Sequence, residues 1–375
     1  MRGFSLIALM LAACFALSGC AFRAEVENQA YVLILGIERR EDGMLELTAR
    51  VPKIGESSNG NKEGGTASPY QTFSARGTNW VNALENLQWI TPRELNLSHI
   101  KLMIVSDTLA SEAGFSRLIR EIAETPHLYT TAHFAVCDGE VSAFVDAMQP
   151  VIGTRLSSDV DAAMRHYAAH GYIPESLFAE VCCVSGSFYS DSVAARCFAG
   201  DIEETKAAAA IIVPDDASAD TPKESPQRFG GCFVFRQGTL ALSLDMRETQ
   251  LLGLVLGNAD SLELERDGVP CALRLEGKQS LAVDIRNHTV VARLEMRFSC
   301  LEVLDGDVAA ALSNQLEAEF EALIRRCQAA HVEPFGFAAA AARRFLTDAD
   351  WMAFDWRSRF AQSTVNVDIS VIPGS

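Results

Sequence analysis

Two histidines are the first residues whose type and spacing could do chemistry. His166 and His170 lie four residues apart, which places both imidazoles on one face of a helix, where they could bind a metal. The glutamate of an H-E-x-x-H motif does not accompany them, so we interpret the pair as part of a solvated helix face. Asp159 and Asp161 come just before, and we expect their carboxylates to favour the start of the same helix.

Two further groups of residues could form sites. Cys182 and Cys183 are adjacent and make no C-x-x-C motif, so we expect no zinc there. A carbohydrate site is one possible use of an acidic and aromatic group near the C-terminus: Asp350, Trp351, Asp355 and Trp356. Because tryptophan is usually largely buried, we expect these rings to pack a helix onto a sheet instead.

Sequence motifs for common reactions are missing. The segment 184–188, VSGSF, lacks the second glycine of a G-x-S-x-G elbow, and neither a Walker loop nor a dinucleotide fingerprint occurs. The formal net charge of -17 opposes binding to phosphate backbones, so nucleic acid is not an expected partner. We expect a non-enzymatic protein without catalytic residues, metal or cofactor.

Cys20 is the residue that we expect to be modified. The uncharged run 4–17 follows Arg2 and, at about 14 residues, is shorter than the ~20 that a spanning helix needs. It leads into LSGC, which matches the bacterial lipobox, whose cysteine takes a thioether-linked diacylglycerol before cleavage and then an N-acyl chain. We predict a signal peptide over 1–19 and an extracytoplasmic body anchored by lipid. The alternative is a buried core helix with a chance cysteine.

The other cysteines show no regular spacing. Once Cys14 and Cys20 are set aside, eight remain: Cys137, Cys182, Cys183, Cys197, Cys232, Cys271, Cys300 and Cys327. Disulfides are permitted by the even number in an exported chain, but several lie in apolar periodic runs. We interpret most of them as buried free thiols.

The first part of the chain alternates strand and helix patterns. The predicted strands are 31–38, 45–51, 70–77, 100–106 and 130–136. One predicted helix begins at residue 79, and three others span 139–148, 158–170 and 174–184. Pro174 is expected in the first turn of the last helix. In the second strand, even-numbered Glu46, Thr48 and Arg50 are expected to face outward, opposite the apolar residues between them.

Two polar segments divide the chain. Residues 55–68 are expected to form a loop, and 214–227 an exposed connection. A hairpin turning at Gln237 follows, then strands at 271–276 and 289–298, a long helix over 308–327 and a strand over 365–371 with one wet face. We predict a multi-domain α+β fold with mixed or antiparallel sheets packed against helices. The expected domains are 20–200 and 229–375, joined by 201–228.

Several motifs, taken in order, resemble a known family. Residues 91–99, TPRELNLSH, follow a helix and lead into a buried strand, residues 233–252 carry the pattern F-x(4)-L-x(3)-L-x(3)-E-T, and 331–337 read HVEPFGF. With the lipobox, this order is similar to the Ger(x)C lipoproteins, the C subunits of spore germinant receptors. Two positions depart from the family pattern: Ala21-Phe22 replaces Trp-Asp, and Glu38 replaces Asp.

The resemblance implies a function without catalysis. It implies a subunit on the outer face of the spore inner membrane, beside two integral membrane subunits, A and B, in a complex that starts germination in response to small nutrients. Whether the C subunit itself contacts the nutrient is left open by the resemblance. The alternatives are a lipid-anchored solute-binding protein of a transporter, which would have regular βαβ lobes, and a lipoprotein hydrolase, which the missing nucleophile motifs disfavour.

One polar corner of the sequence has two interpretations. Pro92 disfavours a helix through Thr91, and Arg93 and Glu94 then present opposite charges before His99. In the first interpretation, these residues fix the turn from helix to strand by local hydrogen bonds. In the second, the corner docks onto the membrane subunits.

Overall fold

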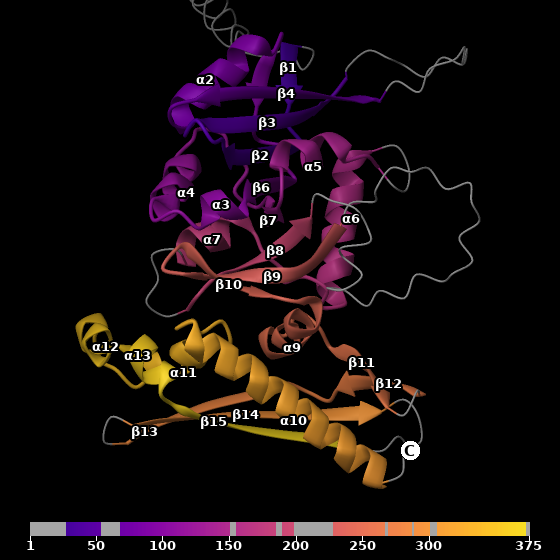
Figure 1. Ribbon diagram of the computed structural model, residues 1–375, viewed down its shortest axis with the longest axis vertical. Coiled ribbons are helices and arrows are strands. Elements are labelled where there is room, and N and C mark those ends of the chain that lie inside the picture. Colours follow the sequence, from indigo (N-terminus) through magenta and orange to yellow (C-terminus); the bar gives the residue numbers. More distant parts are fainter. Residues whose placement is uncertain are drawn as a thin grey trace, which may run out of the picture.

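A mixed sheet of eight strands forms the upper half of the molecule (Figure 1). The computed structural model describes residues 28–53, 68–150, 155–184, 190–198, 228–266, 269–286, 289–300 and 306–372. Cys20, the predicted signal peptide 1–19, residues 55–67 of the predicted loop and residues 201–227 of the predicted connection lie outside these ranges.

The centre of this sheet is parallel and its margins are antiparallel. In spatial order the strands are β10 (Thr239–Leu244), β9 (Arg228–Arg236), β8 (Val193–Phe198), β7 (His133–Asp138), β6 (Leu102–Ser106), β2 (Ile34–Arg39), β3 (Leu45–Pro52) and β4 (Tyr70–Gly77). The four central strands from β8 to β2 run parallel to one another. The predicted α+β class with mixed sheets is confirmed.

Helices cover both faces of the sheet (Figure 1). One face carries α2 (Trp80–Ile90), α3 (Asp107–Ala110), α4 (Phe115–Ala123) and α7 (Phe178–Val184), and the other carries α5 (Val141–Ala147) and α6 (Leu156–Ala169). Every residue of β6, LMIVS, is buried, as expected for a parallel strand between two helical layers.

The predicted wet face of β3 is wrong. Glu46, Thr48 and Arg50 are all buried, because α5 lies over the side of the sheet to which they point. Arg50 is 2% exposed, and its Nη1 donates to Thr72 Oγ1 at 2.6 Å and to Asp146 Oδ1 at 3.0 Å. Period-two polarity in this strand therefore marks a buried polar layer.

Glu46 is the best-paired acid of this layer. Its Oε2 accepts hydrogen bonds from Arg40 Nε at 2.5 Å and from Arg76 Nε at 2.9 Å. Burial acts to raise the pKa of Glu46, but the two arginines outweigh it and hold the pKa below the usual 4.5. The carboxylate therefore stabilises the fold above that pH.

We predict that Glu46 contributes to acid sensitivity. Its pKa is lower in the folded than in the unfolded chain, so its stabilisation is lost as the pH falls from about 5 through the folded value. Chemical denaturation at a series of pH values should show Glu46→Gln losing less stability than the unsubstituted protein over this interval. Glu41→Gln, at an exposed position of the same hairpin, is the control. Equal slopes for Glu46→Gln and the unsubstituted protein would contradict the prediction.

Two local predictions fail for identifiable reasons. Helix α7 begins at Phe178, because Pro174 lies in an extended segment in which Ser176 exchanges hydrogen bonds with Phe134 of β7. Asp161 does not serve the start of α6; its carboxylate pairs with Lys101 Nζ at 2.9 Å. Asp159 does lie in the first turn of α6.

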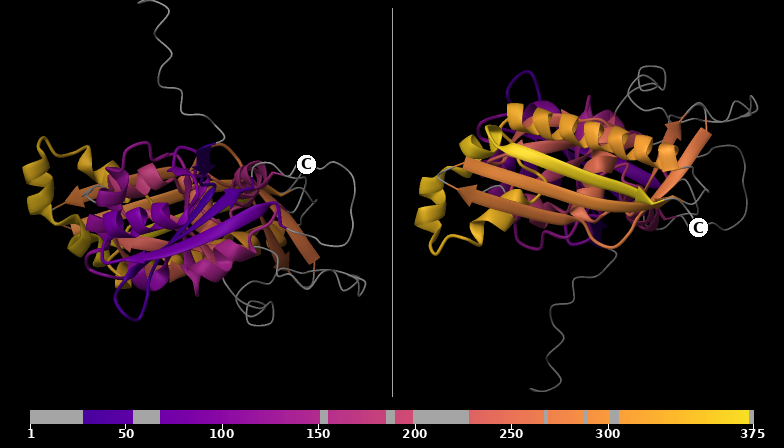
Figure 2. Two further views of the ribbon diagram at one scale, coloured as in Figure 1. Left: turned by 90° about the horizontal axis from the view of Figure 1, so that it is seen from above. Right: turned by 90° about the horizontal axis from the view of Figure 1, so that it is seen from below.

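A second sheet forms the lower half of the molecule (Figure 1). Its strands are β11 (Ser261–Arg266), β12 (Val269–Leu275), β14 (Thr289–Cys300), β13 (Ser280–Arg286) and β15 (Thr364–Ile372), of which β15 pairs in parallel with β14. One face packs on α9 (Met246–Leu256), α10 (Gly306–Ala329), α11 (Phe337–Ala342), α12 (Asp348–Phe354) and α13 (Trp356–Ala361). The opposite face carries no described helix (Figure 2). The predicted alternation in β15 and the apolar stripe of α10 are confirmed.

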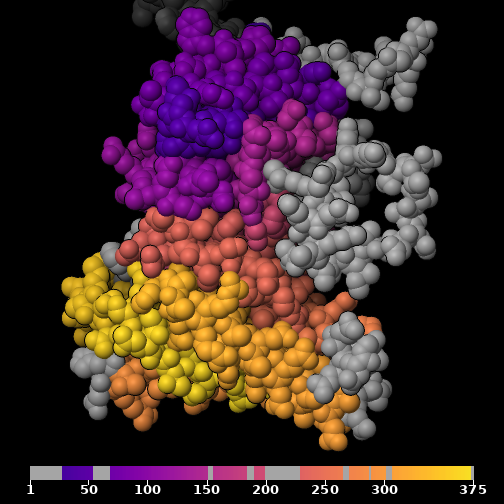
Figure 3. Space-filling model, in the orientation of Figure 1, coloured from indigo at the N-terminus to yellow at the C-terminus, as the bar shows by residue number. Residues whose placement is uncertain are grey.

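Strands β9 and β10 join the two halves. Strand β9 already includes Arg228, the last residue of the predicted connection, and it pairs with β8 of the first sheet. The chain turns from β9 into β10 at Gln237, as expected. Their apolar residues, such as Val234 and Leu244, pack into the core of the second sheet. The space-filling view shows this segment as a band between the two halves (Figure 3). Because β9 begins at Arg228, the predicted boundary at 228/229 falls within a strand of the first sheet.

A buried carboxylate shapes the entry to α11. The Glu333 side chain accepts four backbone N–H groups, from Phe335, Gly336, Phe337 and Ala338, at 2.7–3.1 Å. Burial raises the pKa of Glu333 to about 8, and the N–H donors oppose this shift. The backbone N–H of Glu333 in turn donates to Asp191 Oδ2 at 2.8 Å, and Asp191 Oδ1 accepts from Arg357 Nη2 at 2.7 Å.

We predict that Glu333→Gln destabilises the protein. Above the pKa of about 8 the side chain is a carboxylate with two acceptor oxygens, so the variants are compared there. The amide keeps the shape of the side chain but replaces one acceptor oxygen with a donor, which leaves at least one buried N–H unpaired. The expected loss in the free energy of unfolding is about 1–3 kcal/mol, measured by chemical denaturation. Glu263→Gln, at an exposed position of the second sheet, should stay within about 0.5 kcal/mol. A Glu333→Gln variant as stable as this control would contradict the account.

Candidate docking groove

The predicted corner lies where α2 ends. Pro92, Glu94 and His99 are exposed and Arg93 is half-buried. Helix α2 closes at Thr91, whose Oγ1 donates to the carbonyl of Leu87 at 2.7 Å. The chain then forms β5 (Glu94–Asn96), which pairs in parallel with β1 (Gln29–Tyr31), the first described strand.

Gln88 fixes the turn, a role that the sequence analysis missed. Its Nε2 donates to the carbonyl of Arg93 at 3.0 Å, and its Oε1 accepts the N–H of Leu95 at 2.8 Å. Among the described residues, the side chains of Arg93 and Glu94 make no hydrogen bond or ion pair, and His99 packs edge-on against Tyr31 at 4.9 Å. The only feature of the sequence that could have indicated this role is the position of Gln88, an amide side chain in the last turn of a predicted helix.

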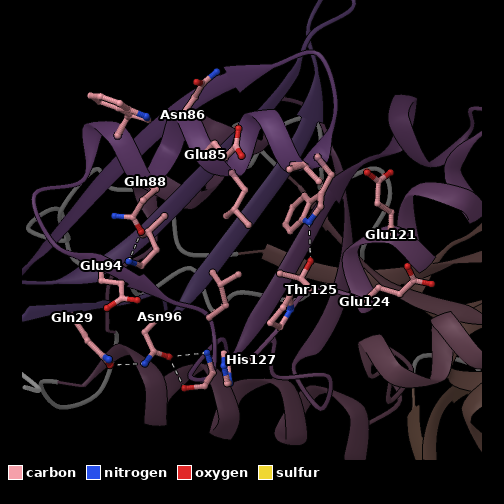
Figure 4. Close-up of a pocket in the computed structure, with 18 residues that line it drawn as sticks. Gln29, Glu85, Asn86, Gln88, Glu94, Asn96, Glu121, Glu124, Thr125 and His127 are labelled. Carbon is pink, nitrogen blue, oxygen red and sulfur yellow. Dashed lines mark hydrogen bonds between the residues drawn. The ribbon is translucent and has the colours of Figure 1, made fainter. Parts of the chain in front are cut away.

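The corner borders a groove of about 1120 Å³. Its walls are α2, the segment 94–98 around β5, and the end of α4 with residues 124–127 (Figure 4). Trp80 Nε1 donates to Thr125 Oγ1 at 2.8 Å and ties two of these walls together. Asn96 Nδ2 donates to Gln29 Oε1 at 2.6 Å and holds the third wall to β1.

Carboxylates surround the groove. Four of its lining residues are glutamates: Glu85 from α2, Glu94 from β5, Glu121 from α4 and Glu124 just beyond it (Figure 4). No lysine or arginine is among the described residues that line it, and His127 is the one histidine among them. The groove therefore favours a positively charged occupant.

The outer face of α2 adds an apolar surface. Trp89 is 86% exposed and Val81 is 53% exposed, and with Glu85 they lie four residues apart on one face of the helix. The opposite face, with Trp80, Ala83 and Leu87, packs into the core of the first sheet. Trp89 thus lies outside the cores of the described residues, although an exposed tryptophan is unusual.

Both parts of the chain match known protein families. The description "Spore germination protein N-terminal domain" matches residues 23–182, and "Spore germination B3/ GerAC like, C-terminal" matches 230–372. The chain belongs to the Ger(x)C family. This is the family of spore germination proteins that resemble germinant-receptor C subunits.

Two curated relatives and one solved structure are similar to this Ger(x)C protein. Spore germination protein KC of Bacillus subtilis (strain 168) is 28% identical over 133 residues, which are 35% of this chain and 33% of that protein. The putative spore germination protein YfkR of the same strain is 21% identical over 385 aligned positions, covering 96% of this chain and 93% of YfkR. The crystal structure of the GerBC protein aligns with a TM-score of 0.54 over 90% of this chain and 96% of GerBC, at 12% identity, and shares the fold.

Other candidate site residues of the Ger(x)C protein lie apart from the groove. His166 and His170 are exposed, and a ring nitrogen of His170 lies 2.8 Å from the carbonyl of His166. Cys182 is half-buried, and burial raises the pKa of its thiol to about 12, whereas Cys183 is exposed. All eight described cysteines are free thiols, and the other six are buried.

The C-terminal tryptophans are part of the second core, as predicted. Trp351 and Trp356 are buried and their rings stack at 5.7 Å. The Asp350 carboxylate accepts a hydrogen bond from the hydroxyl of Thr347 at the start of α12. Asp355 lies between α12 and α13 with a positive φ of 51°. These four residues form a folded helix pair without an open carbohydrate surface.

We predict that Gln88, and not Arg93, stabilises the corner. Gln88→Ala removes two hydrogen bonds to the turn and should lower the free energy of unfolding by about 1–2 kcal/mol. Arg93 takes part through its backbone carbonyl, so Arg93→Ala should change stability by less than about 0.5 kcal/mol. The two variants can be compared by thermal and chemical denaturation of the body. A larger loss for Arg93→Ala would restore the internal role that the sequence suggested for its side chain.

Proposed function

We propose that this Ger(x)C protein is the lipid-anchored, non-catalytic C subunit of a nutrient germinant receptor. The observation that carries the proposal is the match of both parts of the chain to spore germination families, in a sequence that also contains LSGC. The subunit acts on the outer face of the spore inner membrane, with integral membrane subunits A and B, in nutrient-triggered germination.

The lipid anchor is proposed at Cys20. Seven residues lie between Cys20 and Asn28, the first described residue, and the eight steps from one Cα to the next, at about 3.5 Å each, reach at most about 28 Å. The body would therefore stay close to the bilayer surface. Among the described residues, no helix is both long and apolar enough to span a membrane. The diacylglycerol and the N-acyl chain on Cys20 would supply enough acyl chains for stable anchoring.

A role without catalysis is supported by the surroundings of the reactive side chains. The pKa of Cys182 is raised by burial, which disfavours the thiolate that attacks substrates or binds metals. The solute-binding alternative expects two lobes of regular βαβ units, whereas the second sheet pairs β11, β12, β13 and β14 antiparallel.

We predict that Cys20→Ala removes the protein from the membrane. Without the thiol no thioether can form, so the variant should accumulate as an unprocessed precursor or leave the membrane fraction. Spores carrying it should lose most nutrient-triggered germination. Fractionation, mass spectrometry of the N-terminal peptide and a germination assay measure these effects, with Cys183→Ala as the exposed-cysteine control. Mature, membrane-bound Cys20→Ala protein would refute the anchor.

A separate experiment tests the partners. The tagged chain, solubilised from spore membranes in mild detergent, should co-purify with the A and B subunits. Absence of both subunits from a preparation that contains intact, lipid-modified protein would refute the receptor assignment while leaving the anchor in place.

A further inference from the structure

We propose that the acidic groove beside α2 binds a basic, amphipathic polypeptide segment of an integral membrane subunit. The occupant carries lysine or arginine residues that meet the groove carboxylates, and apolar side chains that cover Trp89 and Val81. This inference rests on the proposed function, because it takes the partner to be a membrane protein of the same complex.

Charge complementarity specifies the kind of segment. Glu85 and Glu94 approach the groove from the α2 and β5 walls, and Glu121 and Glu124 approach it from the α4 wall (Figure 4). Glu85, Glu94 and Glu124 are exposed, and none of the four is paired with a described lysine or arginine. A cationic segment would be attracted from either side, whereas an acidic one would be repelled.

Exposed apolar side chains supply the anchor. Seven large apolar side chains are exposed in the described part of the chain, and three of them belong to the single helix α2: Val81, Trp89 and Ile90, the last of which is 50% exposed. Tryptophan next to a groove is the kind of residue that provides most of the binding energy of an interface. The core face of α2 is already packed, and Trp89 is not part of any core cluster of the described residues.

The location indicates a partner at the membrane. Gln29, in the strand nearest the proposed anchor, lines the groove, and β1 and α2 lie at the same end of the molecule (Figure 1). The short chain between Cys20 and Asn28 would keep this end near the bilayer. An integral membrane subunit of the same complex would have segments at the same distance from the bilayer surface as the groove.

Three other occupants fit less well. An anionic lipid surface would be repelled by the four glutamates. The chain's own segment 21–27, AFRAEVE, has one arginine and two glutamates, and so lacks the positive charge. A second copy of this chain carries a formal net charge of -17, which opposes self-association through an acidic groove.

The groove is already formed without the occupant. The Trp80–Thr125 bond joins α2 to the segment after α4, and the two bonds of Gln88 hold β5 to α2. Ser98 N–H donates to Asn96 Oδ1 at 2.9 Å and orders the end of the β5 wall. Binding would therefore cost little ordering of the walls.

Photo-cross-linking in spores tests the proposal. Trp89→p-benzoylphenylalanine in the full lipid-modified chain should cross-link, on irradiation, to a peptide of a membrane subunit that contains lysine or arginine beside apolar residues. The control is the same replacement at Leu346, which is 98% exposed in the other half of the molecule. We expect at least about five times more cross-linked product from position 89 than from position 346.

A charge-reversal pair provides the second measurement. Glu121→Lys with Glu124→Lys, added to the position 89 probe, should lower the cross-link yield about tenfold, because two attractions become repulsions. The matched control, Glu263→Lys with Asp368→Lys on exposed positions of the second sheet, should leave the yield unchanged.

The other outcomes overturn the groove proposal. Cross-links from position 89 only to lipid, only to residues 21–27, only to a second copy, or to nothing would each do so. If the A and B subunits still co-purify with the tagged chain from spore membranes, the proposed function survives without the groove. If they do not, the receptor assignment fails as well.

Discussion

The buried carboxylate of Asp191 connects the two sheets. It lies just before β8 of the first sheet, and it accepts a backbone N–H of Glu333 and the guanidinium of Arg357 from the second half of the chain. Loss of either donor would leave a buried charge partly unpaired, which is strongly unfavourable. The side chain of Glu333 accepts hydrogen bonds from the backbone N–H groups at the start of α11, and α11 packs on β13 within the second core. One side chain thus sets the position of the HVEPFGF segment.

The sequence predicted the elements in which a single face is buried. The stripe of α10 and the alternation of β15 were correct because each element has one apolar and one wet side. The error at β3 has the opposite cause. Its polar face is covered by α5, and its charges are neutralised by partners far away in sequence, such as Asp146 for Arg50. The alternation of residues shows which face of a strand is polar. A polar face is exposed to solvent only where no second layer covers the strand.

The groove was beyond the reach of sequence analysis for a similar reason. Proline and the charges after it drew attention to residues 92–94, of which only Glu94 lines the groove. The bonds of the turn come from Gln88, an unremarkable amide within a helix. The acidic rim combines Glu85 with Glu121, which approach only because α2 and α4 pack side by side on the same face of the sheet. No local pattern encodes such a pairing.

The short strand β1 also gives the fold a mechanical property. Three residues, Gln29 to Tyr31, form its register with β5, and the N–H of Val32 adds a hydrogen bond to the carbonyl of Asn96. Because the hydrogen bonds between the strands run across the strand axis, a pull along β1 loads them and the Gln29–Asn96 contact together, in shear. Strand β5 is at the same time a wall of the groove. A displacement of β1 along its axis would therefore be transmitted directly to a wall of the groove.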